Sequence, residues 1–265
     1  MSIERKRSLL RVSIEKARNP VIPYTNDFNS NVTETMRIEV VANPSQDIIT
    51  QRIKTSIKTK HLGKKLNPDY IGRYGGESFI VAGCGSSINL LNDLSSHFVI
   101  GVNDIERILT PDFLVVVNEI KTFTRGRWEY VRDSKSPIIF SHLDNPGPIT
   151  NPERLVKIEL GRRENPNLNQ FNSVDYTMNS PYMGVIIAYQ LGARKIAITG
   201  VDFTDDHFFS KTGTHKLSKH LKVIDNEYSI LRIELEKRGV QVANLSPISL
   251  LESWPKMTLQ QFQDI

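Results

Sequence analysis

The sequence has a single cysteine, Cys84, among its 265 residues. One thiol excludes a disulfide framework and a structural zinc site built on several thiolates. No apolar run approaches the roughly 20 residues that a membrane-spanning helix needs. The basic N-terminus is not followed by the apolar segment of a secretory signal. We therefore expect a reducing, cytoplasmic location, with peripheral attachment at the inner membrane surface as the alternative.

Several signatures of nucleotide sites and catalysis are also missing. After Gly83 and Gly85 there is no third glycine to complete a dinucleotide fingerprint, and no Gly-Lys-Ser/Thr of a P-loop follows. A serine-hydrolase elbow and the protein-kinase motifs are absent as well. Hydrophobic residues nevertheless make up 39% of the chain, which is enough to bury a core and excludes wholesale disorder.

Charge is unevenly distributed along the chain. Residues 1–75 contain 14 Lys/Arg and 7 Asp/Glu, a net charge of +7, whereas residues 76–265 contain 20 and 22, a net charge of −2. Such a basic segment is either a solvated face or a surface for nucleic acid, an acidic membrane or an acidic glycan. We predict a basic N-terminal extension over residues 1–75 and a folded domain over residues 76–265.

The hydrophobic pattern predicts an α/β domain. In the extension it indicates a short strand over 37–42 and an amphipathic helix over 47–60. In the domain we expect a helix over 88–94 capped by Ser86 and Ser87, and a long surface loop over 144–172. Further helices are expected over 180–191 and 225–238, and strands over 78–82, 97–102, 112–117, 137–140, 195–199 and 240–244. Short strands that alternate with helices predict a Rossmann-like, mostly parallel sheet with helices on both faces.

Small and polar residues follow the predicted strands. Ligands in open α/β sheets bind beyond the carboxyl ends of the strands. Backbone N–H groups reach a phosphate there only where no bulky side chain intervenes, so these ends suit a nucleotide. The candidate residues are Gly83, Cys84, Gly85, Ser86, Ser87, Asn103, Asn118, Gly200, Asp202, Ser246, Pro247 and Ser249.

Three histidines, His207, His215 and His220, lie in a polar segment before the last long helix. A neutral histidine can remove the proton of an incoming hydroxyl, and the alternative for each is a plain surface residue. Lys216, Lys219 and Lys222 of the same segment are candidates to neutralise a leaving phosphate.

Two other chemistries are weaker candidates. Asp202, Asp205 and Asp206, with His207, do not match a familiar metal-ligand spacing, so we predict no metal. Cys84 lies near a predicted helix N-terminus, where a thiolate nucleophile would be stabilised. It lacks a clear base partner, and we interpret it as a small residue that fills the turn.

Four segments resemble, in the same order, those of a known enzyme family. The family elements are GNGPSL, an asparagine that closes the second strand, a Thr-Ser-Gly-Val-Tyr helix with a strand ending Gly-Ile-Asp-Phe, and Cys-Pro-Asn-Ser-Leu. Their counterparts here are residues 83–88 (GCGSSI), Asn103, residues 179–203 and residues 245–250. Over residues 78–251 the chain is therefore similar to the family-42 sialyltransferases and related lipooligosaccharide enzymes, whose fold is a GT-A-like variant.

The resemblance implies a glycosyltransferase that uses a nucleotide sugar and needs no metal or other cofactor. The donor would contact Gly83, Gly85, Ser87, Asn103, Asn179 and Ser180, and its base would lie at Ser246, Pro247 and Ser249. His220, or His215 as second choice, would be the general base on the hydroxyl of a glycan or other surface saccharide.

The chain departs from the family pattern at several positions. Cys84 replaces an asparagine, Ser86 a proline and Asn179 a threonine, and the tyrosines that contact phosphate have no clear counterparts. The donor sugar, sialic acid or another, therefore stays open, as does the oligomeric state.

Other functions remain as alternatives. The same transfer chemistry on modified DNA bases would use the basic extension to follow the phosphate backbone. A hydroxymethylpterin diphosphokinase-like enzyme would need Mg²⁺ and ATP, and a third alternative is a nucleotide-binding module without activity.

Overall fold

The computed structural model describes residues 70–91, 93–124, 126–143, 149–163, 166–171, 173–204, 206–208, 210–211 and 217–265. The chain divides into two compact units, Met1–His61 and Leu62–Ile265, and every described residue belongs to the second. The predicted strand over 37–42 and the predicted helix over 47–60 lie outside the described residues.

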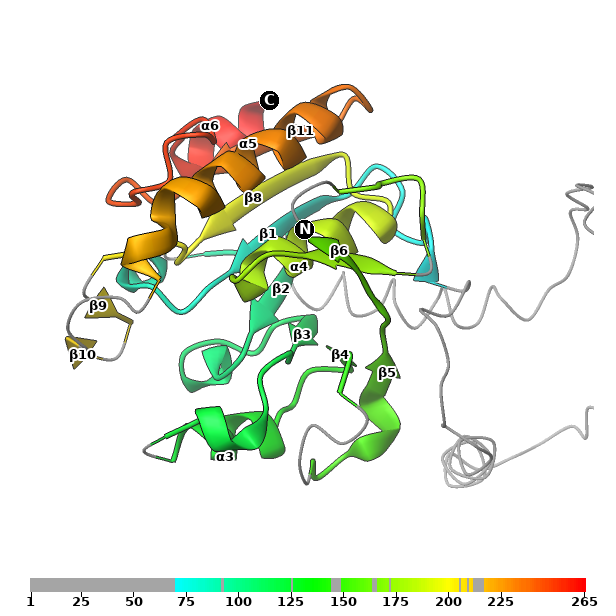
Figure 1. Cartoon of the computed structure of the whole chain (residues 1–265), viewed down its shortest axis with the longest axis vertical. Helices are drawn as coiled ribbons and strands as arrows, with labels where there is room; N and C mark the ends of the chain where they lie inside the picture. Colours follow the sequence, from blue (N-terminus) through cyan, green and yellow to red (C-terminus); the bar gives the residue numbers. More distant parts are fainter. Residues whose placement is uncertain are drawn as a thin grey trace, which may run out of the picture. The chain divides into compact units, whose positions relative to one another are not determined.

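Seven strands form one parallel sheet, ordered β11-β8-β1-β2-β3-β4-β5 (Figure 1). Every neighbouring pair is parallel. From β1 the chain runs through β2 to β5 at one edge, and then returns to place β8 on the other side of β1. This reversal creates a switch point between β1 and β8. The strands are β1 (Ser78–Ala82), β2 (Phe98–Val102), β3 (Phe113–Val115), β4 (Ile138–Ser141), β5 (Leu155–Lys157), β8 (Lys195–Thr199) and β11 (Gln241–Asn244).

Helices cover both faces of the sheet (Figure 1). Helix α4 (Ser180–Gln190) lies against β1, β2 and β8, and α5 (Leu221–Glu236) lies beside it, with the Tyr182 and Tyr228 rings 5.2 Å apart. Side chains of η2 (Ser86–Leu90), α3 (Arg127–Arg132) and α6 (Leu259–Asp264) pack on the other face. The predicted fold class, a Rossmann-like α/β fold with a parallel sheet covered on both faces, is confirmed.

The shorter elements lie mainly at the edges of the sheet and in the connections. They are η3 (Ile105–Arg107), η4 (Ile120–Thr122), η5 (Pro152–Arg154), β6 (Leu160–Arg163), β7 (Val174–Tyr176), β9 (Asp206–His207), β10 (Ser210–Lys211) and η6 (Ser218–His220). Strands β6 and β7 pair with each other, and β9 and β10 form a small antiparallel hairpin.

Three predictions about individual elements were wrong. Only the short η2 forms within residues 88–94, because Ser87 hydrogen-bonds to Asp202 instead of capping a longer helix. Residues 144–172 are not one loop, since β5 and β6 form there. Helix α5 begins at Leu221 rather than at residue 225. Helices α3 and α6 were not predicted, although Thr258 and Gln261 form a capping box at the start of α6.

The segment before β1 packs on the domain. The Gly72 N–H donates to the Gln190 carbonyl at 2.8 Å, and the Tyr74 N–H donates to the Leu191 carbonyl at 2.7 Å. The Tyr74 side chain is buried among the aromatic residues at the start of the strands. The boundary between residues 75 and 76 stays a prediction, and within the described residues the packed domain already includes Tyr74.

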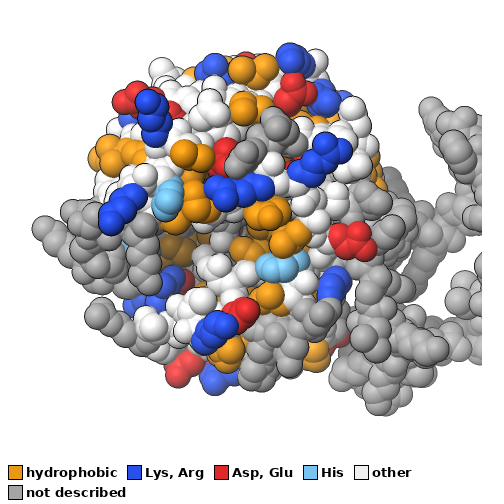
Figure 2. Space-filling view, in the orientation of Figure 1, with side chains coloured by type: hydrophobic (Ala, Val, Ile, Leu, Met, Phe, Trp, Pro, Cys, Tyr) orange, Lys and Arg blue, Asp and Glu red, His pale blue; other side chains and the backbone are white. Residues whose placement is uncertain are grey.

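The described surface mixes charges of both signs. On the face shown in Figure 2, basic and acidic side chains are interspersed with polar and apolar ones. Among the helices that the structure describes, none has the length and apolar character to cross a membrane.

Candidate functional site

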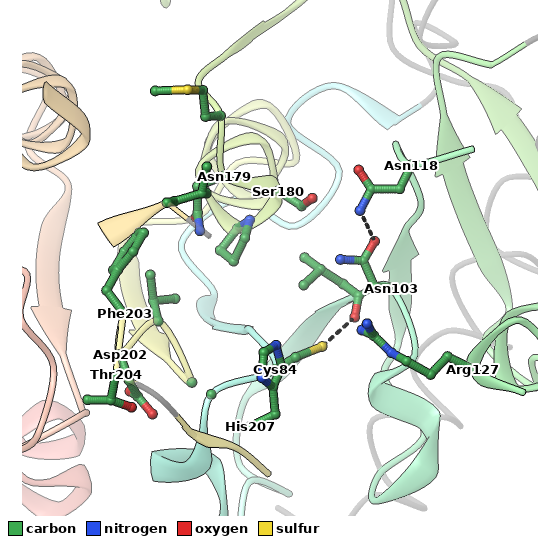
Figure 3. A pocket seen from close by; sticks show the side chains of 17 residues that line it. Cys84, Asn103, Asn118, Arg127, Asn179, Ser180, Asp202, Phe203, Thr204 and His207 are labelled. Atoms are coloured by element: carbon green, nitrogen blue, oxygen red, sulfur yellow. Dashed lines mark hydrogen bonds between the residues drawn. The ribbon is translucent and has the colours of Figure 1, made fainter. Parts of the chain in front are cut away.

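A cavity of about 220 Å³ opens at the carboxyl edge of the sheet, at the switch point between β1 and β8 (Figure 3). Its walls come from the turn after β1, the ends of β2 and β3, the loop after β8 and the start of α4. Eight of the residues predicted from the sequence line it: Cys84, Gly85, Asn103, Asn118, Asn179, Ser180, Gly200 and Asp202. Strand ends that are far apart in the sequence thus meet in one hollow.

A buried hydrogen-bond network forms the base of the cavity. The Asp202 side chain is 2% exposed and accepts hydrogen bonds from the Ser87 N–H at 2.8 Å and the Ser87 hydroxyl at 2.6 Å. The hydroxyl oxygens of Ser87 and Ser246 are 2.5 Å apart, and the Gly200 N–H donates to both. This network joins the turns after β1, β8 and β11, so Ser87 and Ser246 bond protein groups behind the cavity wall.

The glycine-rich turn is required by the packing of the protein itself. A Cβ on Gly85 would lie 2.5 Å from Asp202 Oδ2 and 2.8 Å from the Gly200 carbonyl oxygen. The Gly83 N–H donates to the Thr199 carbonyl and the Gly85 N–H to the Gly200 carbonyl, at 2.8 and 2.7 Å. These N–H groups are therefore used within the fold, and the turn does not offer them to a phosphate.

Asparagine side chains supply polar groups to the walls. Asn118 Nδ2 donates to Asn103 Oδ1 at 3.3 Å, and the Tyr228 hydroxyl donates to Asn179 Oδ1 at 2.7 Å. Burial raises the pKa of Tyr228 well above its ordinary value, so the phenol stays a donor. With both Oδ1 atoms occupied, the Nδ2 ends of Asn103 and Asn179 are the donors that face the cavity (Figure 3).

Two lining residues have a left-handed backbone. Asn103 has a φ of 54°, which asparagine tolerates, and Phe203 has a φ of 58°, which is rare for a bulky residue. Such conformations persist where surrounding structure enforces them, and they gather at functional sites. Asn103 follows β2 directly, and Phe203 lies in the loop after β8, so both belong to the carboxyl edge of the sheet.

An arginine that was not predicted as a site residue, Arg127, also lines the cavity. Arg127, at the start of α3, donates from Nε to Asp104 Oδ2 at 2.8 Å and from Nη2 to Asp104 Oδ1 at 2.5 Å. The Asp104 carboxylate is completely buried at the end of β2. No sequence signal marks Arg127, because it follows no strand end and its partner lies 23 residues earlier.

Cys84 lies against this ion pair. Its sulfur is 3.5 Å from the Val102 carbonyl oxygen and 3.8 Å from Asp104 Oδ1. Desolvation by the surrounding protein, and then the charge of Asp104, raise the pKa of the thiol far above its ordinary value. A neutral thiol supports the interpretation of Cys84 as a residue that fills the turn rather than as a nucleophile.

The two described histidines of the segment before α5, His207 and His220, differ in their position relative to the cavity. His207 lines the cavity. It forms an antiparallel β-bridge with Gly85, and the N–H of the next residue, Phe208, donates to the Cys84 carbonyl at 3.1 Å. His220 is exposed at the N-cap of α5 and does not line the cavity. His215 lies outside the described residues, as does Lys216.

Several other predicted residues lie away from the cavity. Ser249 is buried and its hydroxyl donates to the Val201 carbonyl at 2.7 Å, whereas Pro247 is exposed. Gly83 and Ser86 do not line the cavity, but Met178, Phe203 and Thr204 do, without having been predicted. Asp205 is outside the described part of the chain, and within that part no group of three or more His, Cys, Asp or Glu side chains is arranged to hold a metal.

No protein-family model and no curated protein matches the chain. Among solved structures it is similar to the sialyltransferase CstII from Campylobacter jejuni in complex with cytidine 5′-monophosphate, with 15% identity over 69% of this chain and 86% of that chain and a TM-score of 0.42. It is also similar to the MAf glycosyltransferase from Magnetospirillum magneticum AMB-1, with 14% identity and a TM-score of 0.47. That second likeness covers 80% of this chain and 38% of the other. Because both TM-scores are below 0.5, we describe the fold by the strand order of its own sheet and not by either similarity.

Proposed function

We propose that the cavity binds a nucleotide sugar and that the protein is a glycosyltransferase. One observation carries the proposal. Asn103, Asn118, Asn179 and Ser180 come from three separate segments, all were selected from the sequence as donor-binding candidates, and all four line one cavity at the switch point. Ligands in open α/β sheets bind at this place.

The chemistry of the walls suits a sugar attached to a phosphate. The Nδ2 groups of Asn103 and Asn179 are donors for sugar or phosphate oxygens. The start of α4, at Ser180, supplies the partial positive charge of a helix N-terminus. In the proposed transfer the acceptor oxygen bonds to the anomeric carbon, and the bond from that carbon to the phosphate oxygen breaks. The nucleotide leaves with the electron pair, and the acceptor proton passes to a base.

The donor-binding step is tested by thermal stability in the presence of CMP, UDP, GDP and ATP, with and without Mg²⁺. A ligand that binds only the folded state adds about 2.7 kcal/mol at a concentration of 100 times Kd. We expect one nucleotide to stabilise the protein without Mg²⁺, and Asn103→Ala to weaken its binding. Asn226→Ala, an exposed asparagine on α5, is the matched control. Absence of any stabilisation, or equal affinity in Asn103→Ala, would refute the proposal, and a strict need for Mg²⁺ with ATP would favour the diphosphokinase-like alternative.

The general base is proposed to be a histidine. The position before α5 favours His220, and the lining of the cavity favours His207. We expect loss of the base to lower kcat by roughly 10²–10⁴-fold with little change in donor affinity. His207→Gln and His220→Gln serve as controls for each other. If both variants keep wild-type turnover, neither His207 nor His220 is the base.

The acceptor is proposed to be a glycan or other surface saccharide. The net charge of +7 on residues 1–75 favours one second candidate, modified DNA. Duplex DNA held through its phosphates would lose affinity with a log–log salt slope of about −0.9 per neutralised phosphate. Gel shifts of the full chain at two salt concentrations, with liposome sedimentation alongside, separate DNA from an anionic membrane. Failure to bind DNA would remove the second candidate.

A further inference from the structure

Arg127 is in an unusual position for an arginine. Of the described residues that line the cavity it is the only Lys or Arg, and its side chain is 22% exposed. Its carboxylate partner, Asp104, is completely buried. The lysines that were candidates to neutralise a phosphate, Lys219 and Lys222, are exposed and do not line the cavity.

An ion pair with a buried carboxylate does not by itself explain why an arginine lines the cavity. Desolvation of a carboxylate and a guanidinium can consume most of their mutual attraction, so a buried pair is weak evidence of a contribution to stability. Arg127 is also the first residue of α3, where a positive charge opposes the helix dipole. A role toward a ligand accounts for the placement better than a role in stability.

The ion pair orients the guanidinium. Asp104 accepts from Nε and Nη2, and this side-on pairing fixes the plane and the direction of the guanidinium. Figure 3 shows the Arg127 side chain reaching Cys84 and Asn103, across the cavity from Asp202, Phe203 and Thr204. A guanidinium held in this way meets an anionic oxygen group with its direction already set, and Arg is the side chain best suited to phosphate and carboxylate.

We propose that Arg127 binds the anionic oxygen group of the ligand in this cavity, either a nucleotide phosphate or a carboxylate on the sugar. The identity of the ligand as a nucleotide sugar rests on the proposed function, but the recognition of an anionic group does not. Asp104 is a positioning residue, because it acts by orienting Arg127. The start of α4 also lines the cavity and adds its partial positive charge.

The chain offers a matched control on the same helix. Arg132 donates from Nε and Nη2 to Asp133 at 3.0 and 2.7 Å, the same side-on pairing as that of Arg127, but both partners are exposed and neither lines the cavity. Arg127→Gln and Arg132→Gln therefore remove the same charge and the same type of pair. Arg127→Gln leaves Asp104 buried without its cation, so a second variant, Asp104→Asn with Arg127→Gln, replaces the pair with neutral amides of similar size.

Calorimetric titration of the full chain measures binding of cytidine, uridine, guanosine and adenosine, their monophosphates, and the matching nucleotide sugars. Pyrophosphate alone is a fourth class of probe, beside the nucleosides, the monophosphates and the nucleotide sugars. For the wild type we expect the phosphate to increase affinity over the nucleoside, and Arg127→Gln and the double variant to reduce that increase about ten- to hundredfold. Nucleoside binding should change little, and Arg132→Gln should behave as the wild type does.

The outcomes separate the two proposals. A loss confined to nucleotide sugars that carry a carboxylate assigns Arg127 to the sugar, and a loss shared with monophosphates assigns it to the phosphate. If no nucleotide binds but pyrophosphate binds in an Arg127-dependent manner, the donor proposal fails and the anion site stands. If no probe binds less tightly to a folded double variant than to the wild type, or if no anionic probe binds the wild type, the inference is overturned.

Discussion

The amino and carboxyl edges of the sheet are built from the same strands but have different chemistry. At the amino edge, Tyr74, Phe79, Phe98 and Phe113 form an aromatic cluster with ring centroids 4.9–6.4 Å apart. Burial raises the pKa of Tyr74 to about 12, so even its phenol is neutral at ordinary pH. Large aromatic side chains of this kind dominate the energetics of a core.

The carboxyl edge carries features that cost free energy. Asp104 and Asp202 are buried carboxylates, and Asn103 and Phe203 hold left-handed backbones. Each such backbone costs about 1–3 kcal/mol and persists because the surrounding structure enforces it. The difference predicts that the amino edge serves mainly stability and that the carboxyl edge gives up stability for the proposed ligand site, so mutations at the two edges should separate the two properties.

The largest effect is expected at the amino edge. Phe113 is 1% exposed and contacts the other rings of the cluster, so Phe113→Ala should lower the free energy of unfolding by about 3–5 kcal/mol. Ligand affinity of the folded fraction should not change. Urea unfolding measures the first and titration the second. Ile233→Ala, at a 42% exposed position on α5, should change stability by no more than about 0.5 kcal/mol. A comparable loss of ligand affinity in Phe113→Ala would show that the edges are coupled.

A smaller effect on stability is expected at the carboxyl edge, together with a loss of binding. In Gly85→Ala the new methyl group must displace Asp202 and the Gly200 carbonyl, which should destabilise the fold by about 1–3 kcal/mol and shift the cavity wall. Gly75→Ala is the control, because its Cβ would only touch the Gly72 carbonyl oxygen at 3.4 Å. Unchanged stability and affinity in Gly85→Ala would mean that the network at Asp202 yields without consequence.

The sequence predicted the fold class and much of the cavity for a simple reason. Apolar runs identify buried strands, and the residues that follow parallel strands must meet at one edge, as Asn103, Asn118 and Asp202 do. The stripe Ile224, Tyr228, Leu231 and Leu235 in α5 is buried as its spacing predicts.

What the sequence did not predict depends on long-range contacts. Ser86 and Ser87 resemble a helix cap, but Ser87 bonds Asp202, which lies 115 residues further on. The three residues of β5 are too few for a periodic pattern, and their pairing with β4 makes them a strand. The pairing of Arg127 with Asp104 appears only when α3 packs on η3, the short helix that follows Asp104.

A milder change tests whether a residue that holds a cavity-lining side chain in place serves binding more than stability. Tyr228→Phe removes only the hydroxyl that donates to Asn179 Oδ1, a hydrogen bond worth about 0.5–1.5 kcal/mol. We expect a stability loss in that range and weaker donor binding, because the Asn179 amide is no longer held in one orientation. Tyr130→Phe, at a 41% exposed tyrosine on α3, should affect neither. Wild-type donor affinity in Tyr228→Phe would show that Asn179 is oriented by other contacts or does not bind the donor.

The smallest expected effect on stability comes from the ionisation of Cys84, whose rate of chemical labelling reports on the carboxyl edge. Desolvation and then the Asp104 charge raise its pKa, so the native thiol should be almost entirely protonated at pH 8. Below the ordinary thiol pKa of about 8.5 both the folded and unfolded chains are neutral at this position. As the pH rises through that value only the unfolded chain ionises, so the contribution of Cys84 to stability falls.

Iodoacetamide should therefore label native protein at least about tenfold more slowly than protein in urea. A bound nucleotide should slow labelling further, because the residue lines the cavity. Labelling of the native protein at the rate seen in urea would show an accessible thiolate, and with it a carboxyl edge more open to solvent than the buried Asp104 carboxylate indicates.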